Sequence, residues 1–309
     1  MEHIIRFQTN FSSVESARFL LDNRYLRVAA TCPNLTHLRL DFSLCKSLKP
    51  HHVVSLACLL DEYQQARIFI IISESTTLAY QYLERLGFLQ RWLTPGWNNS
   101  DDQALATRDL TSSRLWRFTV GEDTAFINET YARLKACFFA QKDVSALPSY
   151  LGEIINNVFD HAFASEAADR LAYALVQYYP SSGRLFVAVA DFGIGIPNSV
   201  NRFLTQHGHE AVSAVESVRR AMLPLFSSHS RPHNRGRGLD TLRTGIQGLQ
   251  GFMLIQTSGV LYYLNGAGKE QIFPVEEFHF PGTTLSLRLF ENKLLADEAE
   301  ITDDEASLF

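Results

Sequence analysis

LFVAVADFGIGIP, residues 185–197, passes from a run of six apolar residues to a turn that contains one carboxylate and two glycines. The apolar run has the length and composition of a buried strand. A carboxylate at the end of a strand, here Asp191, can accept a hydrogen bond from an amino group of a ligand. Gly193 and Gly195 permit positive φ angles and a close approach of the backbone to that ligand. An ordinary surface turn has the same pattern, so other parts of the chain must decide between the two.

A helical pattern upstream, residues 152–162 (GEIINNVFDHA), carries three polar residues at intervals of four. Because of the helical period, Glu153, Asn157 and His161 lie on one slowly drifting face. An Asn carbonyl oxygen is a hard ligand that suits Mg²⁺, an ion that shares the phosphates of its substrate. A carboxylate one turn away can deprotonate an attacking water or hydroxyl. A solvated polar face on an ordinary helix is the alternative interpretation of this segment taken alone.

Two further glycine patterns follow downstream. Residues 235–239, Arg-Gly-Arg-Gly-Leu, precede a helical pattern, and Gly282-Thr283-Thr284 leads into the last predicted strand. A glycine pair at a helix amino terminus presents free N–H groups and the positive end of the helix dipole to a phosphate. Arginine side chains can add charge-assisted hydrogen bonds there. Taken alone, the first pattern is also typical of a flexible hinge.

The order of these patterns resembles the GHKL superfamily of ATP-binding domains, which includes histidine kinases, anti-sigma-factor kinases and gyrase-like ATPases. An ExxxN helix, a DxGxG turn after a strand, a long loop, GxGL before a helix and GT before a strand occur here in that family's order. They span residues 145–290, close to half of the chain. The resemblance implies an α+β sandwich of the GHKL (Bergerat) type that binds ATP and Mg²⁺.

The resemblance also implies a role for each residue of the patterns. Glu153 would be the catalytic general base, Asn157 would coordinate Mg²⁺, and Asp191 would bind the adenine amino group. The other nucleotide-binding residues would be Gly193, Gly195, Gly236, Arg237, Gly238, Leu239, Thr283 and Thr284, with one of the two threonines reaching adenine through water. The continuation of the helix to His161 and Ala162 matches the anti-sigma-kinase style of this motif. Residues 198–234 would form a long, irregular ATP lid, with scattered helical patterning around residues 210–223.

These roles predict an ATP hydrolase or a protein kinase-like signalling protein of the anti-sigma-kinase type, with a protein partner of unknown identity and possible homodimers. A non-catalytic, ATP-gated binding switch is the second hypothesis, because lid ordering by the γ-phosphate is sufficient for switching. A sensor histidine kinase is the third, and it needs a phosphoacceptor His on an upstream helix. The predicted helix 126–140 contains no His, and His51 and His52 lie in the other predicted domain.

Residues 1–95 alternate strand and helix patterns, which predicts an α/β layer with a partly parallel sheet. Strands are predicted at 35–42 and 68–72, the second of them buried on both faces, and helices begin at Pro50 and Ser75. This region more faintly resembles a STAS domain, the fold of anti-sigma-factor antagonists. The phosphorylatable Ser-Gly pair of those proteins is absent from residues 47–52. The resemblance therefore implies a degenerate STAS-like α/β domain used for packing or docking.

The remaining boundaries follow from composition. We expect a linker at 96–118, the GHKL domain at 119–292 and a disordered acidic tail at 293–309. Within the second domain, helices are predicted at 126–140, 147–163 and 238–249, and strands at 170–178, 184–190, 252–256, 260–264 and 283–289.

Overall composition excludes several classes of protein. A net charge of −5 does not suggest a general nucleic-acid binder. No apolar run approaches the ~20 residues that a membrane-spanning helix needs. The four cysteines lack the spacing of a zinc site or a redox pair, so we expect reduced thiols and a cytoplasmic location.

Overall fold

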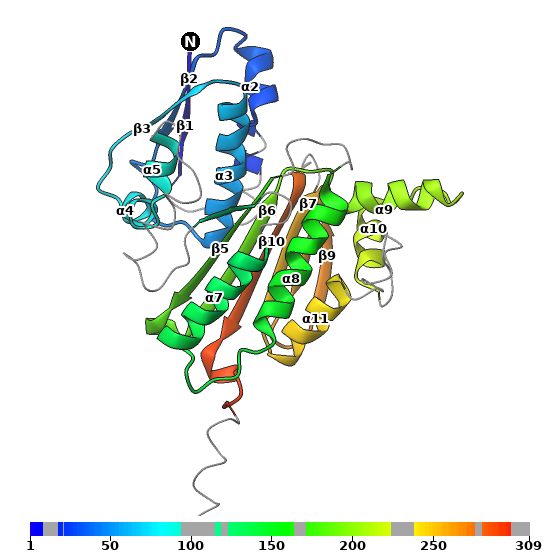
Figure 1. The fold of residues 1–309 in the computed structure, drawn as a ribbon. Coiled ribbons are helices and arrows are strands. Elements are labelled where there is room, and N and C mark those ends of the chain that lie inside the picture. The colour runs from blue at the N-terminus through cyan, green and yellow to red at the C-terminus, as the bar shows by residue number, and fades with distance from the viewer. Residues whose placement is uncertain are drawn as a thin grey trace, which may run out of the picture.

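The computed structural model describes residues 1–8, 18–20, 22–93, 115–118, 123–163, 171–223, 238–275 and 280–297. They form a mixed α/β protein with a three-stranded parallel sheet and a seven-stranded antiparallel sheet (Figure 1). Every helix among these residues is too short or too polar to cross a lipid bilayer.

The small sheet has the order β1-β2-β3, and its strands are β1 (Glu2–Arg6), β2 (His37–Asp41) and β3 (Phe69–Ile72). The helices of this region are α2 (Tyr25–Thr31), α3 (Pro50–Gln65), α4 (Leu78–Arg85) and α5 (Phe88–Leu93). The predicted parallel strands and the helix that begins at Pro50 are confirmed. The prediction that β3 is buried on both faces is wrong, because β3 is an edge strand and its Phe69 is 69% exposed.

The large sheet has the order β4-β5-β6-β10-β7-β8-β9, with every neighbouring pair antiparallel. Its strands are β4 (Trp116–Phe118), β5 (Ala172–Tyr179), β6 (Arg184–Asp191), β7 (Phe252–Ser258), β8 (Val260–Leu264), β9 (Glu270–Pro274) and β10 (Phe280–Phe290). The short strand β4 falls inside the predicted linker 96–118. It joins the sheet because Trp116 and Phe118 alternate toward the core and are buried.

Helices α7 (Asp123–Cys137), α8 (Leu147–Asn157) and α11 (Leu239–Gly248) lie side by side over one face of the large sheet (Figure 1). The predicted helix 147–163 changes after Asn157 into a wider π-helical turn, Val158–Ala162. Within the predicted lid, α10 (Ala214–Ala221) agrees with the helical patterning expected around 210–223, whereas α9 (Gly195–Gln206) is a helix that the sequence pattern did not predict. Helix α9 buries Val200 and Leu204 and helix α10 buries Val218, which stabilises both helices. Residues 224–237 lie outside the described part of the chain.

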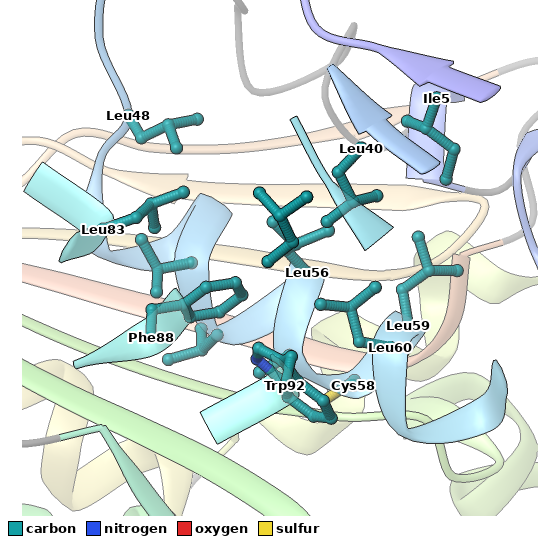
Figure 2. Close-up of a cluster of buried hydrophobic side chains, with 14 of the residues drawn as sticks. Ile5, Leu40, Leu48, Leu56, Cys58, Leu59, Leu60, Leu83, Phe88 and Trp92 are labelled. Atoms are coloured by element: carbon teal, nitrogen blue, oxygen red, sulfur yellow. The ribbon is translucent and has the colours of Figure 1, made fainter. Parts of the chain in front are cut away.

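The opposite face of the large sheet is covered by α3. Alternate residues of β5 point to different cores: Ala174 and Val176 pack with the helices α7 and α8, whereas Tyr173 and Leu175 pack with α3. Figure 2 shows side chains of α3 gathered with Leu40 of β2 and Trp92 of α5 in this second core. The core around α3 therefore contains residues of both predicted domains, and α3 forms a third layer behind the sheet.

Buried polar contacts also join α3, α4 and α5 to the large sheet. They link Ser55 to Thr284 (2.9 Å between hydroxyl oxygens), Cys58 Sγ to the Ala190 carbonyl oxygen (3.4 Å), Tyr82 to Gln177 (2.5 Å), Asp61 to the Tyr173 hydroxyl (3.0 Å) and Arg91 to the same hydroxyl (3.5 Å). Because buried polar groups require partners, these pairs specify where the amino-terminal helices sit on the sheet.

The first residues of the predicted disordered tail are ordered. Leu294 is buried, and the Asp143 N–H donates to the Leu295 carbonyl oxygen (2.9 Å). Asp297 forms an ion pair with Lys135 of α7. The prediction of disorder is therefore wrong for residues 293–297, because they pack against the start of the second domain, and residues 298–309 lie outside the described part.

Candidate functional site

A row of polar residues crosses three neighbouring strands at one end of the large sheet. Asp191 is the last residue of β6, and the register pairs Thr283 of β10 with both Asp191 and Thr257 of β7. All three residues alternate in phase with those that pack against the helical layer, so their side chains share that face. The sheet therefore ends in a carboxylate beside two hydroxyl groups.

Asp191 is only 1% exposed, and two backbone N–H groups hold its carboxylate. Its Oδ1 accepts hydrogen bonds from the N–H of Gly193 (2.8 Å) and the N–H of Thr283 (3.2 Å). Burial raises the pKa of Asp191 to about 7, while the two hydrogen bonds act in the opposite direction. Both bonds end on Oδ1, which leaves Oδ2, within the described part of the chain, as the acceptor for a ligand.

Two glycines of the site allow backbone segments to touch. Gly282 has a φ of 70° in an irregularity of the β10–β7 pairing, and a Cβ there would lie 2.1 Å from the carbonyl oxygen of Asp191. A Cβ on Gly193 would lie 2.1 Å from the carbonyl oxygen of Ala162, at the end of the π-helical turn. The N–H of Ile194 donates to that same oxygen (2.7 Å). The turn after β6 is thus packed directly against the end of the α8 segment.

Thr257 organises the start of α9, and no sequence pattern pointed to it. Its hydroxyl accepts a hydrogen bond from the Ile196 N–H (2.9 Å) and donates one to the Gly282 carbonyl oxygen (3.0 Å). It also lies 3.1 Å from the hydroxyl of Thr283. Gly195, with a φ of 76°, leaves room for this hydroxyl, since a Cβ there would approach it to 2.9 Å. The only sequence signal was the polar triplet 256–258 that ends an otherwise apolar strand.

Thr283 and Thr284 point to opposite faces of β10. Thr284 is 2% exposed, and its hydroxyl lies 2.9 Å from that of Ser55 on α3. The Thr284 side chain therefore points away from the face that carries Asp191, because successive residues of a strand point to opposite sides. Of the two threonines, only Thr283 lies on the face of the candidate site.

A second group of predicted residues meets at the end of α8. The side-chain amide of Asn157 donates from Nδ2 to the backbone oxygen of Glu153 (2.7 Å), and its Oδ1 faces Gly238. A Cβ on Gly238 would lie 3.1 Å from that oxygen, so the amino terminus of α11, where Leu239 is the first residue, abuts the amide. The side chain of Glu153 is half-buried one turn earlier. Gly236, Arg237 and the His161 side chain lie outside the described residues.

The turn Val158–Ala162 connects the two groups. It begins directly after Asn157 and ends at Ala162, whose carbonyl oxygen holds the turn that follows Asp191. π-helical turns are frequently found at functional sites. The arrangement offers a buried acceptor at one end and a hard oxygen beside a helix amino terminus at the other. This combination suits a ligand with a hydrogen-bond donor at one end and an anionic, metal-binding group at the other.

A scan against models of known protein families finds no match for this chain, and a search of curated proteins finds none either. Function therefore has to be inferred from the chemistry of the site itself.

Proposed function

We propose that this protein binds Mg-ATP through a domain of the GHKL type and is an ATP hydrolase or a protein kinase-like signalling enzyme of the anti-sigma-kinase type. The observation that carries the proposal is the buried carboxylate of Asp191, held by the N–H groups of Gly193 and Thr283 on the helical face of an antiparallel sheet. Those residues belong to two separate sequence patterns, the turn after β6 and the start of β10, that the resemblance assigns to one nucleotide. Their mutual contacts support that assignment.

In this proposal, the Oδ2 of Asp191 accepts a hydrogen bond from the adenine amino group. Guanine carries a carbonyl oxygen at the equivalent position and would be repelled, so the carboxylate selects adenine. The Thr283 hydroxyl, beside Asp191 on the same face, would hold a water that contacts the adenine ring. The residues that would hold the phosphates and Mg²⁺ are Gly238, at the amino terminus of α11, and Asn157 through its Oδ1. When bound, Mg²⁺ would neutralise charge on the phosphates.

The general base of the proposed reaction is Glu153, four residues before Asn157 and therefore on the same face of α8. Its role is to take a proton from the attacking water or hydroxyl. Glu153→Gln should keep the binding of a non-hydrolysable ATP analogue and lower turnover by about 100-fold, since a general base typically contributes at least that factor. Calorimetry and a phosphate-release assay measure the two effects. Unchanged turnover in this variant would show that Glu153 is not the base.

Asn157→Ala tests the metal ligand, and its neighbour in the sequence offers a matched control. Asn156 is also half-buried on α8 but points about 100° away around the helix. Asn157→Ala should remove the Mg²⁺-dependent part of the affinity for the ATP analogue, whereas Asn156→Ala should leave it intact. Equal Mg²⁺ dependence in both variants would contradict the assignment.

The threonine pair separates binding from folding. Thr283→Val should weaken ATP binding several-fold, whereas Thr284→Val should leave it unchanged and reduce the free energy of unfolding by about 1–2 kcal/mol, because Ser55 loses its buried partner. Calorimetry and urea unfolding measure the two effects. A loss of affinity confined to Thr284→Val would mean that the site lies on the α3 face.

The second candidate is a non-catalytic, ATP-gated binding switch. The observation that favours it is the position of α9, which begins at Gly195 in the turn after Asp191 and is tied to Thr257 through the N–H of Ile196. A ligand that moves this turn would move α9 and the adjacent α10. A wild-type protein that binds ATP but neither hydrolyses it nor transfers phosphate to a partner would favour the switch.

A sensor histidine kinase has the least support. Helix α7 contains no histidine, and both His51 and His52 are buried in the amino-terminal core, where a phosphoryl donor could not reach them. The amino-terminal part is better explained as a degenerate STAS-like domain used for packing, because its α3 lies on the large sheet. A protein partner and a cytoplasmic location remain part of the proposal.

A further inference from the structure

The residue between Asp191 and Gly193 points away from the candidate site. Phe192 follows Asp191 in the extended chain, and its ring packs against the core that contains α3. The guanidinium carbon of Arg24, at the start of α2, lies 4.6 Å from the centroid of this ring. A cation placed over an aromatic face at this distance is attracted to it. The amino-terminal part of the chain therefore contacts the turn of the site directly.

The Arg24 side chain is itself held in place. Its Nε donates to Oε2 of Glu62 on α3 (2.7 Å), and its second nitrogen pairs with the other oxygen of that carboxylate. Both side chains are 19% exposed, which makes the pair more persistent than a fully solvated one. The preceding residue is tied to the same helix, because the Tyr63 hydroxyl donates to the Asn23 carbonyl oxygen (2.7 Å). Arg24 thus contacts both Glu62 of α3 and the Phe192 ring.

Helix α3 also contacts the strand on the other side of Asp191. The Cys58 thiol donates to the carbonyl oxygen of Ala190 (3.4 Å), so contacts from α3 and its bound Arg24 flank Asp191 at Ala190 and Phe192. A rotation of the backbone at Phe192 would displace the N–H of Gly193, which is one of the two donors to the Asp191 carboxylate. The contacts behind the sheet therefore bear on the orientation of the carboxylate in front of it.

We propose that Arg24, Glu62 and Phe192 form a positioning clamp through which the amino-terminal domain sets the geometry of the Asp191 turn and, with it, the affinity for nucleotide. The effect on affinity rests on the proposed function; the effect on the turn does not. Any partner or modification that shifts α3 or separates Arg24 from Phe192 then changes nucleotide binding without touching the binding face. The domain that carries α3 is a regulator of the site.

The test uses the full-length chain and two readouts. Hydrogen exchange at the amides of Gly193 and Ile194, measured without nucleotide, reports the turn, and calorimetry with a non-hydrolysable ATP analogue reports the affinity. Arg24→Met removes the cation and keeps much of the apolar stem. It should speed exchange at both amides and weaken binding by about fivefold, the factor that corresponds to a partly buried cation–π contact. Phe192→Leu should act in the same direction, and Phe192→Tyr, which keeps the ring, should restore both values.

Tyr82→Phe is the matched control. It removes another buried contact between the two parts of the chain, the hydrogen bond to Gln177, which lies five residues along β5 from Ala172, the partner of Asp191 in the sheet. This variant should leave exchange at Gly193 and the affinity unchanged, even where its melting temperature falls.

If the folded Arg24→Met variant showed the wild-type rate of hydrogen exchange at Gly193, the clamp would be overturned. The clamp would also be overturned if Tyr82→Phe increased this rate as much as Arg24→Met, because that result would indicate a general loosening of the interface. A wild-type protein that fails to bind the analogue, while Arg24→Met still speeds exchange at Gly193, would disprove the proposed function and leave the positioning role standing.

Discussion

Replacing Asp191 by asparagine is expected to weaken ATP binding by about 100-fold, or about 2.7 kcal/mol. The amide oxygen would remain with the N–H groups of Gly193 and Thr283, which already bind Oδ1. The amide NH₂ would then face the amino group of adenine, so two hydrogen-bond donors would meet in a buried site. Leaving both donors without an acceptor reduces the binding free energy by more than the loss of one hydrogen bond alone. Calorimetry with an ATP analogue measures the effect. Unaltered affinity would contradict the adenine assignment.

The same substitution should not destabilise the fold at neutral pH. Burial raises the pKa of Asp191 to about 7, above the value of an unfolded Asp, so its contribution to stability is fully present below the unfolded pKa of about 4 and is lost as pH rises through about 7. Asparagine carries no charge and so avoids the cost of burying one. The melting temperature of the variant, relative to that of the wild type, should therefore increase as the pH rises from about 4 to about 7. A difference in melting temperature between the two proteins that stays constant from about pH 4 to about pH 7 would contradict the raised pKa of Asp191.

Replacing Gly282 by alanine is expected to reduce the free energy of unfolding by more than about 3 kcal/mol, the range of severe single substitutions. The new Cβ would lie 2.1 Å from the carbonyl oxygen of Asp191 and 2.6 Å from the nitrogen of Gly193, and both atoms belong to the backbone. The φ of 70° adds strain for any residue with a Cβ. To relieve this clash, the backbone at Asp191 must move, and that movement displaces the Asp191 carboxylate. ATP binding should therefore decrease together with the free energy of unfolding. Urea unfolding and calorimetry measure both effects.

Two other glycines separate the causes. Gly208 has a φ of 76° but open space around its Cβ position, so Gly208→Ala reports the backbone strain alone, about 1 kcal/mol. Gly248 has neither a positive φ nor a close neighbour, and Gly248→Ala should be neutral or slightly stabilising. If Gly282→Ala were no worse than Gly208→Ala, the close packing of the turn against Asp191 would be refuted.

The local parts of the candidate site were predictable because their causes are local. The spacing of Asp191, Gly193 and Gly195 indicated a turn after a buried strand, and the structure has β6 followed by that turn. The interval between Glu153 and Asn157 indicated one helix face, and both residues lie in α8. Neither pattern required knowledge of a distant residue.

Other features of the site depended on residues far apart in the chain. Thr257 contacts the turn after β6 because the register of β7 and β10 places it opposite Thr283. Thr283 lies on the face of the site and Thr284 lies on the α3 face, although they are neighbours in the sequence. The Gly-Thr-Thr pattern contains both residues and does not indicate which of them faces the site. The edge position of β3 was also missed, since a continuous apolar run does not show whether a second neighbour exists.

By itself, the sequence determined where most strands, helices and glycine turns lie, because backbone conformation and the alternation of apolar residues depend on near neighbours. The tertiary structure alone decided that α3 covers the back of the large sheet and that Arg24 contacts Phe192. Those contacts join residues more than 100 positions apart, and they arise from the requirement that both faces of β5 and β6 be buried.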